Sequence, residues 1–144
     1  MKLEEIQQQW ERDSCIDRTE LGEESLRIPQ LHSKYYQIYS TERSMLRQLE
    51  YKMINLKRSK YEWYAGTISE EELKEKNWEP NPLKILRSDI PMYLESDEEI
   101  VNLNVKLEFQ RDKVEFVESI IKSLPSRGYQ IKAAIDWEKF KVGA

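Results

Sequence analysis

Apolar residues in this chain recur mostly at intervals of three and four, the period of an α-helix that buries one face. Between Ile100 and Leu124 the apolar positions follow at steps of 3, 4, 7, 3, 4 and 3, with Gln110 filling the longest step. Such a seam predicts a helix that meets another helix at a shallow crossing angle. The seam consists of Ile100, Leu103, Leu107, Val114, Val117, Ile121 and Leu124.

Capping and breaking residues set the expected ends of this helix. Ser96 and Glu99 are spaced as a capping box, so the helix is expected to begin at about Asp97. Pro125 lacks an amide hydrogen and is expected to end the helix at Leu124.

A second long periodic stretch runs from about Gln30 to Ala65 without a helix breaker, and Gly66 stands where a left-handed C-terminal cap belongs. An acidic helix start at residues 19–24 is expected to stop or bend at Pro29, whose ring suits the first turn of the next helix. The apolar stripe comprises Leu31, Tyr35, Ile38, Met45, Leu49, Met53, Leu56 and Trp63, with Glu42 and Lys60 filling its gaps.

Shorter elements complete the expected fold. Helices are predicted at residues 3–12, at residues 69–76 behind a Ser69 cap, and at residues 130–141. Residues 77–95 are expected to form mostly loop because they contain three prolines. The sequence therefore predicts an all-α chain, with two long antiparallel helices and short N- and C-terminal helices.

Composition limits the class of protein. The 144 residues fit one domain, and 4 Gly with 5 Pro supply little turn material for a β-sandwich or a phosphate-binding loop. One cysteine and one histidine exclude a disulfide framework and a Cys/His metal cluster. No apolar run is long enough for a membrane span, and the charged N-terminus does not resemble a signal peptide, so a cytoplasmic protein without a cofactor or metal is expected.

The net charge of −4 hides a strong segregation of sign along the chain. Residues 33–66 carry 7 basic and 3 acidic side chains, whereas residues 67–100 carry 4 basic and 10 acidic ones. Seven of the 15 aromatic residues also lie in the basic block. Cations neutralise phosphates and aromatic rings stack on unpaired bases, so this block has the composition of a single-strand binding segment.

The densest candidate site is the sequence LKRSKYEWYAG at residues 56–66. On a helix, Lys57, Lys60, Tyr61 and Tyr64 fall at i, i+3, i+4 and i+7 and form one stripe, with Arg58 on its flank. Arg47 extends this positive face toward the N-terminus. The alternative interpretation is a solvated helix face with tyrosines at its edge.

Two acidic clusters, residues 70–72 and 97–99, are the only candidates for acid–base or metal chemistry. Both fall in the first turn of predicted helices, where carboxylates stabilise exposed amides and the helix dipole. No nucleophile, base or cofactor loop accompanies them, so the sequence does not predict an enzyme.

At LKRSKYEWYAG the chain resembles the UvsY family, recombination mediators of T-even-type phages. The family pattern there consists of a basic pair one residue apart, an acidic residue, an aromatic pair, and a helix end made of a small residue and Gly. The matching residues in this chain are Arg58, Lys60, Glu62, Trp63-Tyr64 and Ala65-Gly66. Further similarity lies in LEEIQQQWERDSCIDRTEL, LHSKYY and IKSLPSRGYQIK. Residues 67–95 do not align with the family pattern.

The resemblance implies a non-enzymatic accessory protein of homologous recombination and recombination-dependent replication and repair, acting in the cytoplasm of a phage-infected cell. Such a protein binds single-stranded DNA through the basic motif, with Arg58 and Lys60 as the matched pair. It contacts the recombinase and the single-strand-binding protein, and helps load the recombinase. It also assembles into a ring of more than two subunits. The expected parts are residues 1–66 for DNA binding and 96–144 for assembly.

The C-terminal helices carry more apolar surface than one facing helix can cover, which also indicates a homo-oligomer. The residues expected at subunit contacts are Val117, Ile121, Leu124, Ile131, Ile135 and Phe140. A purely structural coiled-coil adaptor, without nucleic-acid binding, is the alternative function.

Overall fold

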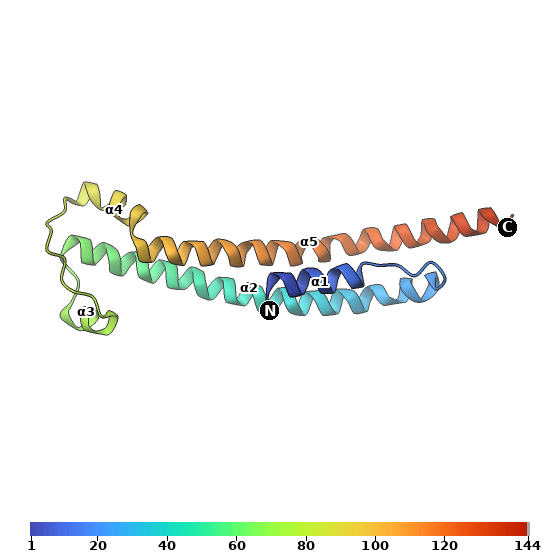
Figure 1. Ribbon diagram of the computed structural model, residues 1–144, viewed down its shortest axis with the longest axis horizontal. Helices are drawn as coiled ribbons and strands as arrows, with labels where there is room; N and C mark the ends of the chain where they lie inside the picture. The colour runs from blue at the N-terminus through green and yellow to red at the C-terminus, as the bar shows by residue number, and fades with distance from the viewer. Residues whose placement is uncertain (144) are drawn as a thin grey trace. The chain divides into compact units, whose positions relative to one another are not determined.

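The structure is a computed structural model that describes residues 1–143, and all of its regular elements are helical. In chain order they are α1 (Leu3–Asp13), α2 (Leu21–Ala65), α3 (Glu70–Lys76), the 3-10 helix η1 (Arg87–Asp89), α4 (Ile90–Ser96) and α5 (Glu98–Lys141) (Figure 1). No β-strand occurs within residues 1–143, so the expectation of an all-α chain is confirmed. The predicted short helices near residues 3–12 and 69–76 are also confirmed.

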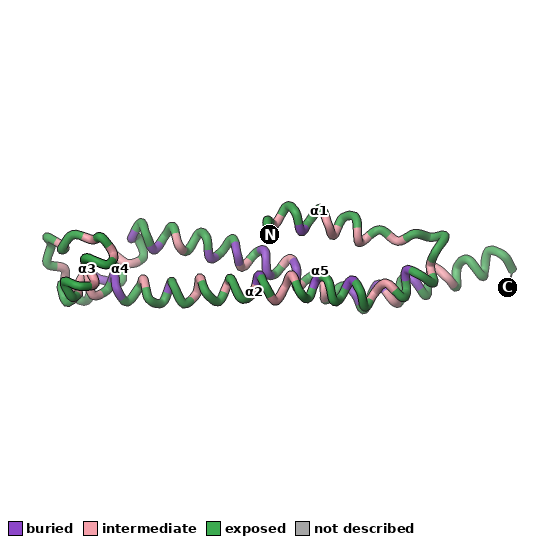
Figure 2. Tube along the Cα trace, turned by 90° about the horizontal axis from the view of Figure 1, so that it is seen from below, coloured by how far each residue is buried: buried purple, intermediate pink, exposed green. Residues whose placement is uncertain are grey.

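The chain divides into two compact units, and both long helices contribute to each. Unit 1 combines Met1–Ser44 with the chain from Arg111 onward, and unit 2 comprises Met45–Gln110. Figure 2 shows buried positions recurring along α2 and α5, as expected for helices that bury one stripe each.

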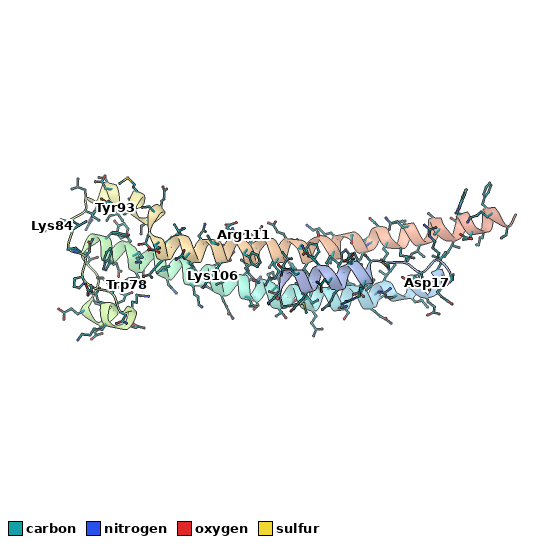
Figure 3. The ribbon with its side chains drawn as sticks, in the orientation of Figure 1. Asp17, Trp78, Lys84, Tyr93, Lys106 and Arg111 are labelled. Atoms are coloured by element: carbon teal, nitrogen blue, oxygen red, sulfur yellow. The ribbon has the colours of Figure 1, made fainter. Side chains whose placement is uncertain are left out.

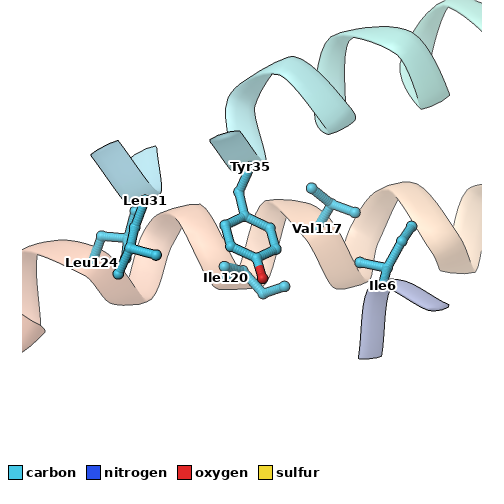
Figure 4. Close-up of a cluster of buried hydrophobic side chains, with 6 residues drawn as sticks. All are labelled: Ile6, Leu31, Tyr35, Val117, Ile120 and Leu124. Atoms are coloured by element: carbon cyan, nitrogen blue, oxygen red, sulfur yellow. The ribbon is translucent and has the colours of Figure 1, made fainter. Parts of the chain in front are cut away.

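The core of unit 1 brings α1, α2 and α5 together (Figure 4). Tyr35 of α2 is fully buried, and its ring meets the Trp10 ring edge-on at a centroid distance of 5.3 Å. Its hydroxyl donates a hydrogen bond of 2.8 Å to Asp13, at the end of α1. The buried cluster consists of Ile6, Leu31, Tyr35, Val117, Ile120 and Leu124.

The core of unit 2 is smaller and is built from Met53, Ile100 and Leu107, with partly buried leucines around them. Met45, expected on the buried stripe, is 44% exposed and lies outside this core. The polar residues that fill gaps in the apolar stripes, Glu42 and Gln110, are buried. The seams therefore continue through polar positions.

Pro29 does not divide the first long helix. The expected break is wrong, because α2 runs from Leu21 to Ala65 with Pro29 inside it. Proline removes the bond to the carbonyl four residues earlier, and both Pro29 and Ser25 are exposed, so water can reach that carbonyl. Gly66 adopts a φ of 76°, which confirms the predicted left-handed cap.

Pro125 does not end the second long helix either. The separate C-terminal helix predicted at residues 130–141 is wrong, because α5 continues unbroken from Glu98 to Lys141. Buried contacts hold the chain on both sides of the proline. Leu124 and Ile131 are each 2% exposed, and Arg127 pairs with Glu24 at 3.0 Å. Tertiary packing therefore outweighs the local cost of proline.

The start of α5 also differs from expectation. The cap is Asp97 rather than Ser96, since the Ile100 N–H donates to the Asp97 carboxylate at 3.1 Å. Ser96 is the last residue of α4, where its hydroxyl donates to the Met92 carbonyl at 3.2 Å. The loop predicted for residues 77–95 thus contains α4, whose first turn accommodates Pro91 and whose Ile90 is fully buried.

Candidate nucleic-acid interface

The outward face of α2 in unit 2 alternates basic residues with exposed apolar and aromatic ones. Its members are Arg47, Tyr51, Ile54, Arg58 and Tyr61, at steps of 4, 3, 4 and 3, which place them on one side of a helix. Tyr51 is 67% exposed, Ile54 63% and Tyr61 40%. We call these five residues the outward face.

Three cations on or beside the outward face are available to a ligand. Arg47, Lys57 and Arg58 are all exposed. Within residues 1–143, the part of the chain that the structure describes, none of the three forms an ion pair. A cation without a carboxylate partner can neutralise a phosphate without first breaking an internal contact.

Lys60 does not belong to this exposed set. The prediction of one solvent-facing stripe is wrong for Lys60, which is 8% exposed. Its ammonium lies 3.3 Å from the Asp97 carboxylate and 3.4 Å from that of Glu99, and 4.4 Å from the centre of the Trp78 ring. Lys60 is buried because its side chain meets Asp97 and Glu99 at the start of α5, whereas Lys57 and Arg58 are exposed.

Tyr64 is also turned inward. Its hydroxyl donates to Asp97 at 2.6 Å, and its ring contacts those of Trp63 and Tyr93 at centroid distances of 4.9 and 5.7 Å. Burial and the bond to Asp97 raise the pKa of the Tyr64 hydroxyl. Tyr64 is therefore part of the packing of unit 2 rather than a free platform, unlike Tyr61.

Asp97 connects several of these contacts. Burial opposes its ionisation, but the hydrogen bonds from Tyr64 and the Ile100 N–H, together with the charge of Lys60, lower the pKa of Asp97. The carboxylate thus caps α5, accepts from Tyr64 and pairs with Lys60 at the same time.

Sequence reasoning missed Tyr51 and Ile54 as members of the outward face. Tyr51 lies four residues after Arg47, and Ile54 four before Arg58. The signal that could have found them is the spacing of the two arginines, since any exposed residue between them in that register shares their face.

A groove adjoins the same region of α2. It has a volume of about 460 Å³ and lies between α2, α4 and α5 of unit 2. Its lining includes Met53, Lys57, Leu94, Glu95 and Val105.

The residues expected at subunit contacts divide into two groups. Val117, Leu124 and Ile131 are at most 2% exposed within the subunit, and Val117 and Leu124 pack against α1 and α2 in the core of unit 1. Ile121 and Ile135 are half-buried, and Phe140 is 71% exposed. The Phe140 ring stacks on that of Trp137, 5.5 Å away and itself 57% exposed.

Residues 1–143 contain no group of three or more His, Cys, Asp or Glu side chains placed to hold a metal ion. None of the helices within this range is long and apolar enough to cross a membrane. The acidic cluster at residues 70–72 lies in the first turn of α3, and that at 97–99 starts α5, as the helix-capping interpretation predicts.

An all-helical chain with unpaired cations and exposed aromatic rings on one helix face has the features of a protein that binds a flexible polyanion. The family model "Recombination, repair and ssDNA binding protein UvsY" matches residues 9–144. The chain therefore belongs to the UvsY family of recombination, repair and single-stranded DNA binding proteins.

Two kinds of relative agree with this assignment. The "Recombination protein uvsY" of Enterobacteria phage T4 is 26% identical over 144 residues, which cover 99% of both chains. Crystal structures of the bacteriophage T4 recombination mediator protein UvsY have a similar fold. One has a TM-score of 0.84 at 21% identity, covering 97% of this chain and 99% of the other. A second gives the same TM-score and identity over 99% and 98%.

Proposed function

We propose that this protein is a recombination mediator that binds single-stranded DNA through the outward face of α2 and Lys57. Arg47, Lys57 and Arg58 would neutralise successive phosphates, while Tyr51 and Tyr61 offer ring faces to unpaired bases. The observation that carries the proposal is the set of exposed cations without ion pairs beside exposed tyrosines, in a chain of a family described as single-stranded DNA binding.

The mediator role requires protein partners as well as DNA. We infer that the chain helps a recombinase replace the single-strand-binding protein on DNA, and so contacts both proteins in the cytoplasm of the infected cell. This step is supported by the T4 relative, a recombination mediator protein whose crystal structure has a similar fold. A protein without a nucleotide site can assist such an exchange by binding the strand and lowering the barrier to recombinase nucleation.

We also propose that the protein acts as a homo-oligomer of more than two subunits, arranged in a ring. Its contacts would include the exposed stacked pair Trp137 and Phe140, covered by a second copy. Several weak strand sites on one assembly would then act together through a high effective concentration. An antiparallel packing of α2 and α5 in the subunit is supported by Figure 4, where Leu31 lies beside Leu124 and Tyr35 beside Ile120.

The proposed function is tested by following recombinase filament formation on single-stranded DNA that is first saturated with single-strand-binding protein. Adding this protein should shorten the lag before filaments form, and a variant with Arg47, Lys57 and Arg58 all changed to alanine should not. A triple variant that shortens the lag as well as the unsubstituted protein would refute the assigned DNA site.

A structural coiled-coil adaptor is the second candidate function. The inward positions of Lys60 and Tyr64 favour it, because two residues of the basic motif serve packing within the subunit. The two functions differ in one simple measurement. A mediator binds a labelled oligonucleotide with an affinity that falls as salt rises, whereas an adaptor shows no binding at low salt.

A further inference from the structure

The segment after α2 forms an acidic arm, residues 67–80, that contains α3. It carries five glutamates and two lysines, and it begins directly beside the basic part of α2. The glutamates are Glu70, Glu71, Glu72, Glu75 and Glu79. A tethered acidic segment at this position is a potential competitor for the cations of the outward face, since it has a high effective concentration there.

Two hydrogen bonds attach the arm to one flank of α2. The Ser59 hydroxyl donates to the Glu72 carboxylate at 2.7 Å, and the Trp63 ring N–H donates to the Glu79 carbonyl at 2.7 Å. Ser59 lies two residues from both Lys57 and Tyr61. At 100° per residue, this places Ser59 about 160° around the helix from them. The arm is thus held on the side of α2 away from the outward face, to which Tyr61 belongs.

Lys60 makes the third attachment, through Trp78. Trp78 lies in the segment after α3 (Figure 3). The Lys60 ammonium lies 4.4 Å from the Trp78 ring centre, and the ring N–H of Trp78 donates to Glu99 at 3.0 Å. Glu99 in turn pairs with Lys60 at 3.4 Å. Lys60, Trp78 and Glu99 therefore form a closed set of contacts between α2, the arm and α5, which we call the clamp.

We propose that Lys60 is a positioning residue for DNA binding: through the clamp it holds the acidic arm away from the exposed cations, instead of contacting phosphate itself. The inference rests on the proposed function, because it concerns the same site. Lys60 is 8% exposed and satisfied by two carboxylates and a ring, so a phosphate would have to displace three partners to reach it. Arg58, two residues earlier, presents its charge without that cost.

Trp78→Leu separates the two roles of Lys60. It removes the ring that joins Lys60 to the arm but leaves every cation in place, and Lys60 keeps its ion pairs with Asp97 and Glu99. If Lys60 contacts phosphate, this variant should bind a labelled oligothymidine at least as tightly as the unsubstituted protein. If Lys60 positions the arm, binding at low salt should weaken several-fold, because the released glutamates compete for the cations.

Lys60→Met and Lys57→Met form a matched pair on the same helix, one in the clamp and one exposed. Both of these variants and Trp78→Leu are also combined with Glu70→Gln, Glu71→Gln and Glu75→Gln, which remove three negative charges from the arm. We expect the neutral arm to restore binding in the Lys60 and Trp78 variants to within about twofold of the neutral-arm control. The loss in the Lys57 variant should persist, because a phosphate contact is missing there.

Circular dichroism at the binding temperature shows which variants are folded. If Lys60→Met is unfolded, Trp78→Leu decides the question by itself. Unchanged binding by Trp78→Leu would overturn the inference, as would a Lys60→Met loss that the neutral arm does not restore. An unsubstituted protein that binds no oligonucleotide would instead refute the proposed function.

Discussion

Changing Arg58 to alanine should reduce the salt dependence of single-stranded DNA binding by the contribution of one phosphate. The structure offers three exposed cations without ion pairs at the site, Arg47, Lys57 and Arg58. At about 0.7 log units per phosphate neutralised on a single strand, the slope of log K against log salt is expected to be near −2 for one subunit, and near −1.4 without Arg58.

These slopes give a measurable difference over an ordinary range of salt. Between 50 and 200 mM salt, affinity should fall roughly 20-fold for the unsubstituted protein and roughly sevenfold for Arg58→Ala. Fluorescence anisotropy of a labelled oligothymidine, short enough to meet one subunit, measures both values. Binding should weaken equally for other base sequences, because phosphate contacts carry no sequence information.

Lys52→Ala provides the matched control. Lys52 is exposed on the same helix, six residues before Arg58, which places it about 120° around the helix at 100° per residue. Its removal should leave the slope within error of the original. Equal slopes for Arg58→Ala and the unsubstituted protein would refute the assignment of Arg58, and equal losses at Lys52 and Arg58 would indicate diffuse attraction to the whole basic segment.

Three further outcomes are expected from the structure. Changing Trp137 and Phe140 to serine should lower the native mass of the oligomer, measured by analytical ultracentrifugation, while an unchanged mass would exclude this pair from the interface. Tyr35→Phe removes the hydrogen bond to Asp13 from the core of unit 1 and should lower the free energy of unfolding in urea by about 1–2 kcal/mol. The pKa of Asp97 is lower in the folded chain than the unfolded value of 3.8, so the ionised carboxylate stabilises the fold at pH values above 3.8. This stability should be lost as the pH falls below about 4. An Asp97→Asn variant should keep the α5 cap but lose this part of the acid sensitivity in a pH series of thermal melts.

Helix periodicity predicted the all-α fold and most buried positions from sequence, because a 3.6-residue repeat directly records which face is covered. The prolines were misjudged for a physical reason. A proline costs the helix one hydrogen bond locally, whereas the contacts that outweigh this cost come from distant residues, such as Glu24 on Arg127. Local sequence does not contain that information.

The candidate site was only partly predictable for the same reason. The basic motif lies in the part of α2 that carries the outward face, and Arg47, Lys57 and Arg58 are exposed there as expected. Lys60 has the same charge and a similar local sequence, but its partners Asp97 and Glu99 are brought to it by folding. Which cation of a basic helix is free is therefore decided by tertiary contacts.

Photocrosslinking to a single strand tests the central claim, that the outward face of α2 binds DNA, most directly. An oligonucleotide carrying a photoreactive thymine analogue is bound at low salt and irradiated, and the crosslinked residues are identified by mass spectrometry. Crosslinks are expected within residues 47–61, chiefly at Tyr51 and Tyr61, and should decrease for Arg58→Ala. Crosslinks confined to α1 or to the region of Lys132, with none in residues 47–61, would contradict the proposed site.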